Sequence, residues 1–89
     1  MKLEYSSRAL AQLSSVHEYL SARSPGSARK VTASIRSTIK RLLELPLLGK
    51  ITDEADIHVL IEPEYRYRVF YRISGEKVSV IRILHGSRD

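Results

Sequence analysis

Basic side chains that could contact phosphate gather in the last third of the sequence. They are Arg66, Arg68, Arg72, Arg82, His85 and Arg88. Arginines stabilise the charge of a phosphate, and a histidine whose pKa lies near neutrality can take up or release a proton, so this set could cleave a phosphodiester bond in RNA. The same arginines could instead pair with acidic groups of a protein partner or remain solvated. The residue types alone therefore leave catalysis and binding open.

The remaining polar residues support no other catalytic site. The three histidines lack a metal-binding spacing, and the absence of cysteine excludes disulfides, thiolate zinc sites and a cysteine nucleophile. There is no glycine-rich phosphate loop, nucleophile elbow or Ser-His-Asp spacing. His85 is better explained as a buried or rim histidine, hydrogen-bonded to the backbone, than as a catalytic residue. We therefore predict neither a metal nor a cofactor.

Length and charge limit the class of protein. The 89 residues suit one domain spanning 1–89, and a content of 43% hydrophobic and 28% charged residues is typical of a globular protein. Lysine and arginine total 15 against 10 acidic residues, and the net charge of +5 favours an acidic partner. No apolar run is long enough for a membrane span, and the first residues lack the pattern of a signal peptide, so we expect a cytoplasmic protein.

A short strand and two amphipathic helices are predicted in the first half. Lys2–Tyr5 alternates in polarity, which is typical of a half-buried strand. Apolar residues recur every three or four positions over Arg8–Leu20, behind serines that can cap the helix. A second helix begins at Ser24-Pro25 and runs to Leu45, where Pro46 stops it. The connection between the helices is so short that they must form an antiparallel hairpin.

The second half favours strands. Pro46–Asp56 is predicted to be a loop, and three runs rich in β-branched and aromatic residues follow, at His58–Glu62, Arg66–Ile73 and Lys77–His85. Gly75 lies between the last two runs and indicates a hairpin turn. The order is therefore β-α-α-β-β-β, and we predict an α+β fold in which the helical hairpin packs on one face of an antiparallel sheet.

Alternation along the last two strands predicts which residues face away from the helices. On the first of them these are Arg66, Arg68, Phe70 and Arg72, with Tyr65, Tyr67, Val69, Tyr71 and Ile73 toward the helices. On the last strand one face holds Val78, Val80, Arg82 and Leu84, and the other holds Ser79, Ile81, Ile83 and His85. A chain this short has no spare element to cover the second face of the sheet. We therefore predict that this face is a docking surface.

Several short motifs follow one another along the whole chain. They are Ala9, Leu13, Val16 and Tyr19 on the first helix; Ser24-Pro25 and Ala28 at the start of the second; Leu42, Leu45, Pro46 and Gly49 at its exit; Tyr67-Arg68-Val69 and Tyr71-Arg72-Ile73 on a strand; and Ile83-Leu84-His85-Gly86-Ser87-Arg88-Asp89 at the end. In this order and spacing they resemble the ParE branch of the RelE/ParE superfamily of bacterial toxins.

The resemblance implies a small toxin that is held inactive by a ParD-like antitoxin and that inhibits DNA gyrase. Such an antitoxin would lay an acidic, amphipathic segment along the toxin by helix-in-groove and strand-addition modes, with the sheet face and the helical hairpin as receptors. The expected antitoxin contacts are Arg66, Phe70, Arg72, Val80, Arg82 and Leu84.

RelE-like relatives, which cleave messenger RNA in the ribosome, supply the alternative. Arg68 and Arg82 could match the arginines of that pattern, and His85 its histidine. However, Gly86 follows His85 where that pattern has an aromatic residue, and lysines are missing from the strands. Gyrase inhibition is therefore the favoured interpretation, with ribonuclease activity or a non-toxic interaction domain as alternatives.

Overall fold

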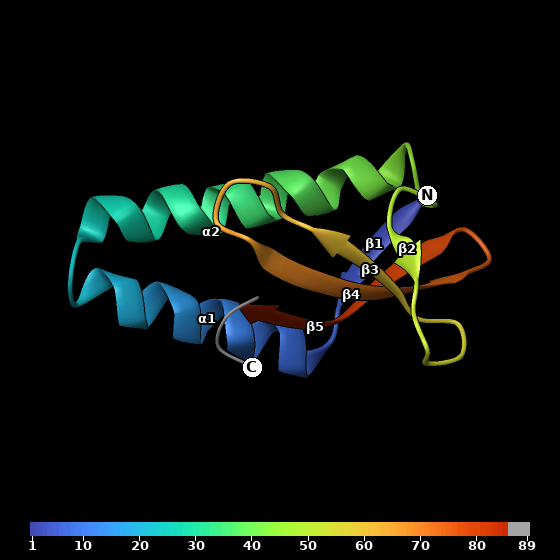
Figure 1. Cartoon of the computed structure of the whole chain (residues 1–89), viewed down its shortest axis with the longest axis horizontal. Coiled ribbons are helices and arrows are strands. Elements are labelled where there is room, and N and C mark those ends of the chain that lie inside the picture. The colour runs from blue at the N-terminus through green and yellow to red at the C-terminus, as the bar shows by residue number, and fades with distance from the viewer. Residues whose placement is uncertain (86–89) are drawn as a thin grey trace.

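Residues 1–85 are described by the computed structural model shown in Figure 1. Its elements are β1 (Lys2–Tyr5), α1 (Ser7–Ser21), α2 (Pro25–Lys40), a short 3-10 helix η1 (Arg41–Leu43), β2 (Lys50–Ile51), β3 (His58–Ile61), β4 (Tyr67–Ser74) and β5 (Lys77–His85). The two helices run antiparallel along the long axis of the molecule and are joined at one end by a short turn, as predicted (Figure 1). Neither helix in these residues is long and apolar enough to cross a membrane.

The helix boundaries follow from the residues that lie there. The Ser6 hydroxyl accepts a hydrogen bond from the Ala9 N–H at 3.0 Å and so caps α1. Pro25 begins α2, at a position where its missing N–H is not needed. The regular helix ends at Lys40 and tightens into η1, so it stops short of the predicted end at Leu45. Such tightening is common in the last turn of a helix.

The strands of residues 1–85 form one five-stranded sheet in the order β1-β5-β4-β3-β2. Neighbours from β5 to β2 pair antiparallel, but β1 lies parallel to β5, so the sheet is mixed rather than purely antiparallel. The helical hairpin lies between β1 and the later strands in the chain, and a parallel pair requires a crossover of this kind. The two-residue strand β2 lies within the stretch that we predicted to be a loop.

The core lies between the helical hairpin and one face of the sheet, which we call the inner face. Its main cluster is made of Ala9, Leu13, Val31, Ile35, Ile39, Tyr67, Val69, Val80 and Ile83. A smaller cluster joins Leu42 of η1 to Tyr71 and Val78. The stripes of apolar residues that predicted the two helices are therefore the faces that the helices bury.

A β-bulge interrupts β5 in its middle. Phe70 of β4 pairs with Arg82, and the next residue Tyr71 pairs with Val80, so Ile81 has no partner on β4. An unpaired residue reverses the alternation of side chains along the strand. Val80 before the bulge consequently faces the helices, whereas Arg82 after it faces away.

Candidate functional site

We call the face of the sheet that points away from the helices the outer face, and it carries a basic and aromatic cluster. The cluster consists of Arg68, Phe70 and Arg72 of β4 with Arg82 and Leu84 of β5. The guanidinium carbon of Arg82 lies 4.1 Å from the centroid of the Phe70 ring, and that of Arg68 lies 5.8 Å from it. These distances are those of cation–π contacts, so both guanidinium groups lie against the Phe70 ring.

The acidic residue Glu54 lies over this cluster. Its carboxylate oxygen Oε1 accepts a hydrogen bond from Nη2 of Arg82 at 2.5 Å. This hydrogen bond holds the pKa of Glu54 below its ordinary value; partial desolvation opposes that effect, and the positive charges of Arg82, Arg72 and Arg8 reinforce it. A single carboxylate is therefore set among three arginines.

The loop that carries Glu54 is held in shape by Thr52. The Thr52 hydroxyl donates to the Ile57 carbonyl at 2.8 Å and accepts from the Glu54 N–H at 3.1 Å, and the backbone N–H of Thr52 donates to the same Ile57 carbonyl. Asp56 adopts a left-handed conformation with a φ of 64°. A compact turn therefore brings Glu54 to Arg82. No spacing in the sequence indicates the ion pair that these two residues form.

His85 lies on the other side of the sheet from the arginines. It pairs with Tyr67 on the inner face, and the two rings meet edge to face with centroids 4.8 Å apart. Together with Val16 and Tyr19 of α1 they line a hollow of about 350 Å³. The predicted nuclease set of Arg68, Arg82 and His85 is therefore divided between the two faces. Arg88 lies outside the described residues.

Two of the six predicted antitoxin contacts do not lie on the outer face. Val80 is fully buried in the core beneath the helices, because the bulge at Ile81 changes the alternation on which its prediction depended. Arg66 precedes β4 in a turn and has a φ of 67°, so strand alternation does not extend to it. The other four, Phe70, Arg72, Arg82 and Leu84, share the outer face as predicted.

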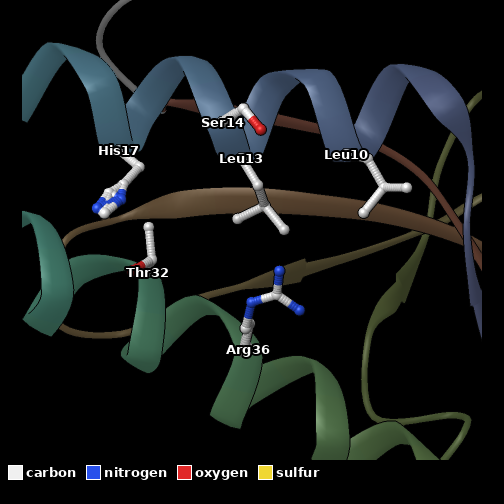
Figure 2. Close-up of a pocket in the computed structure, with 6 residues that line it drawn as sticks. All are labelled: Leu10, Leu13, Ser14, His17, Thr32 and Arg36. Atoms are coloured by element: carbon white, nitrogen blue, oxygen red, sulfur yellow. The ribbon is translucent and has the colours of Figure 1, made fainter.

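A second surface feature is an open groove of about 500 Å³ between the two helices (Figure 2). It is lined by Leu10, Leu13, Ser14 and His17 of α1 and by Thr32 and Arg36 of α2. Figure 2 shows the Leu13 side chain pointing from α1 into the gap and the Arg36 guanidinium pointing toward it from α2. The groove thus combines an apolar floor with a cationic rim. Within residues 1–85, no three side chains suited to metal binding lie together.

Comparison with known proteins shows that the chain is similar to bacterial toxins. Residues 3–89 match the family described as the ParE toxin of the type II toxin–antitoxin system parDE. Toxin RelE2 of Caulobacter vibrioides is 27% identical over 81 residues, which cover 91% of this chain and 90% of that protein.

Solved structures share the fold. The chromosomal ParDE system of P. aeruginosa contains a chain that superposes with a TM-score of 0.85 at 19% identity, covering 96% of this chain and 95% of the other. A chain of the intact E. coli RelBE toxin–antitoxin complex gives 0.69 at 23% identity, with 98% of both chains covered. Isolated E. coli RelE gives 0.70 at 23% identity, covering 99% of this chain and 86% of that one.

Proposed function

The chain belongs to the ParE toxin family of the type II toxin–antitoxin system parDE, and from this premise we propose that it inhibits DNA gyrase and is neutralised by a ParD-like antitoxin. It is a toxin of the ParE/RelE superfamily. We place its action in the cytoplasm, where gyrase and the antitoxin would meet it. In this proposal the protein acts by binding rather than by cleaving a substrate.

The observation that supports binding over cleavage is the division of the predicted nuclease set. A general acid or base must come within about 3 Å of the atom whose proton it transfers, and the arginines must reach the same phosphate. His85 packs on Tyr67 beneath α1, whereas Arg68 and Arg82 lie on the outer face. One phosphodiester bound to the outer face would therefore have no contact with the histidine.

The two surface features fit the partner that we propose. The outer face offers arginines around Phe70 and Leu84, which suits carboxylates alternating with apolar side chains. The groove between the helices offers apolar Leu13 beside Arg36, which suits an amphipathic helix with an acidic edge. An acidic antitoxin could occupy either surface with the same charge complementarity.

Two assays on the purified protein distinguish the activities. We expect it to inhibit the supercoiling of relaxed plasmid by gyrase, and we expect primer extension on ribosome-bound message to show no new cleavage sites. Cleavage of the message without any effect on supercoiling would instead favour the ribonuclease. If expression without the antitoxin does not slow growth, the non-toxic interaction domain becomes the better interpretation.

Substitutions in cells provide a second, independent test. His85→Ala should retain toxicity, because in this proposal the histidine contributes packing rather than chemistry. Arg82→Ala should also retain toxicity, but the antitoxin should protect cells from it less well. A folded His85→Ala protein that has lost toxicity and retains gyrase binding would contradict the proposal.

A further inference from the structure

We propose that the Glu54 carboxylate binds Arg82 at the position that a carboxylate of the antitoxin takes in the complex. On binding, an acidic segment of the antitoxin displaces Glu54 from Arg82. The inference rests on the proposed antitoxin partner and adds a mechanism to that interface. The occupant of the outer face is thus an acidic peptide segment, and the toxin carries its own substitute for one of the segment's acidic side chains.

Exposure indicates which member of the ion pair can move. The side chain of Arg82 is only 17% exposed and lies on the Phe70 ring, while the side chain of Glu54 is 55% exposed at the edge of its loop. The hydrogen bonds that shape the loop involve the backbone of Glu54 and not its carboxylate. The carboxylate can therefore rotate away while the loop and the guanidinium stay in position.

The charges around Glu54 favour replacement by a partner. The positive charges of Arg8, Arg72 and Arg82 all act on this one carboxylate, so three cationic side chains surround a single Glu54. Arg72 is exposed on the outer face. An acidic segment with several carboxylates could engage more of these arginines than Glu54 alone, and its apolar side chains could contact Phe70 and Leu84.

The exchange requires little free energy because one carboxylate replaces another on the same guanidinium. The carboxylate that leaves belongs to Glu54, the exposed member of the pair, and water solvates it once it is released.

Binding of a short soluble peptide of glutamate and leucine to the full chain tests the exchange. The matched peptide with glutamine in place of glutamate serves as the ligand control. At low ionic strength, Glu54→Gln should bind the acidic peptide about two- to fivefold more tightly than the unsubstituted protein, the range expected for removal of one exposed competing charge. The glutamine peptide should show no such gain.

Glu44→Gln is the matched protein control, because Glu44 is also exposed and its substitution changes the net charge equally. We expect it to leave the affinity almost unchanged. If both variants gain equally, the effect is one of overall charge and the exchange is refuted. If Glu54→Gln weakens binding, Glu54 supports the site instead of competing for it, and the proposal is also refuted.

The side-chain N–H signals of arginine in NMR spectra provide a direct readout. The signal of Arg82 should shift on substitution of Glu54 and should shift again when the acidic peptide is added to either protein. An acidic peptide that binds neither protein would refute the exchange while leaving the gyrase assay to decide the proposed function.

Discussion

Glu62 holds the turn between β3 and β4 together through a carboxylate with no exposed surface. Its Oε1 accepts from the N–H groups of Tyr65 at 2.8 Å and Tyr67 at 3.4 Å. Its Oε2 accepts from the Ser34 hydroxyl of α2 at 2.7 Å and from the N–H of Glu64 at 2.9 Å. Burial acts to raise the pKa of Glu62, but these hydrogen bonds outweigh it and hold the pKa below its ordinary value.

Substitution of Glu62 by glutamine should destabilise the protein. One acceptor oxygen becomes an amide nitrogen that cannot accept, so two of the four donor groups around this side chain lose their partner. We expect the free energy of unfolding to fall by about 1–3 kcal/mol, measured by urea denaturation at neutral pH. Glu64→Gln is the control, because that neighbouring side chain is exposed, and it should change the free energy by no more than about 0.5 kcal/mol.

Glu62 should also contribute to acid sensitivity. Because its pKa is lower in the folded than in the unfolded state, the unfolded state takes up the proton first as the pH falls. The contribution of Glu62 is therefore complete above about pH 5 and is lost as the pH falls from there through the lowered pKa. Denaturation at a series of pH values should show a smaller loss of stability for Glu62→Gln than for the unsubstituted protein. Equal slopes would contradict this role.

Gly49 has no room for a side chain. A Cβ atom there would lie 2.6 Å from the Val59 carbonyl oxygen and 2.8 Å from the Tyr71 hydroxyl, which accepts a hydrogen bond from the Gly49 N–H. Gly49→Ala should therefore cost about 1–3 kcal/mol, measured by thermal or urea unfolding. Gly26→Ala is the matched control, since a Cβ atom there meets nothing within 4 Å, and it should not destabilise the protein.

At the scale of elements, α1 satisfies the edge of β5 beyond the end of β1. The Ser6 hydroxyl donates to the Ile81 carbonyl at 2.7 Å, and the Gln12 side-chain oxygen accepts from the Ile83 N–H at 2.6 Å. Polar side chains of a helix thus replace the strand partner that β1 no longer provides. The bulged segment of β5 depends on these contacts for its place against the helix.

Two serines at helix starts allow this role to be measured. Ser6→Ala removes both the cap of α1 and the hydrogen bond to the Ile81 carbonyl, and we expect a loss of about 1–2 kcal/mol in the free energy of unfolding. Ser24 occupies the same position before α2 but makes no capping hydrogen bond, so Ser24→Ala should cost less than about 0.5 kcal/mol. If both substitutions lower the free energy of unfolding equally, the two hydrogen bonds of Ser6 contribute no stability of their own, and this role of Ser6 is wrong.

The spacing of apolar residues, every second position in strands and every three or four positions in helices, was sufficient to predict the elements that form from local contacts. The two helices, their hairpin and the β4–β5 turn at Gly75 lie where apolar spacing and turn residues predicted them. The direction of β1 and the bulge at Ile81 depend on contacts between distant segments, which no local pattern contains. The separation of His85 from Arg82 follows from alternation, but the burial of Val80 depends on that bulge, so the outer face could be predicted only in part.

At the scale of the whole molecule, net positive charge should govern how fast an acidic antitoxin associates. The chain carries a net charge of +5, and long-range attraction accelerates encounter but is screened by salt. Raising the ionic strength should lower the association rate constant on the order of tenfold and change the dissociation rate constant little, measured by stopped-flow mixing of the two separately purified proteins.

Position should matter as well as total charge. Arg72→Gln on the outer face should slow association more than Lys30→Gln, which removes the same charge from an exposed position on α2. An equal effect of the two substitutions would place the antitoxin elsewhere on the molecule.

The place of β5 in the sheet also determines when the fold can close during synthesis. β5 lies between β1 and β4, and the hydrogen bond from Ser6 to Ile81 spans 75 positions along the chain. A nascent chain that ends before β5 can form the helical hairpin from local contacts, but β1 and β4 then both lack their shared neighbour. Both the inner core and the outer face must therefore wait for this late strand, so neither the folded core nor the arginine surface is complete until almost every described residue has been made.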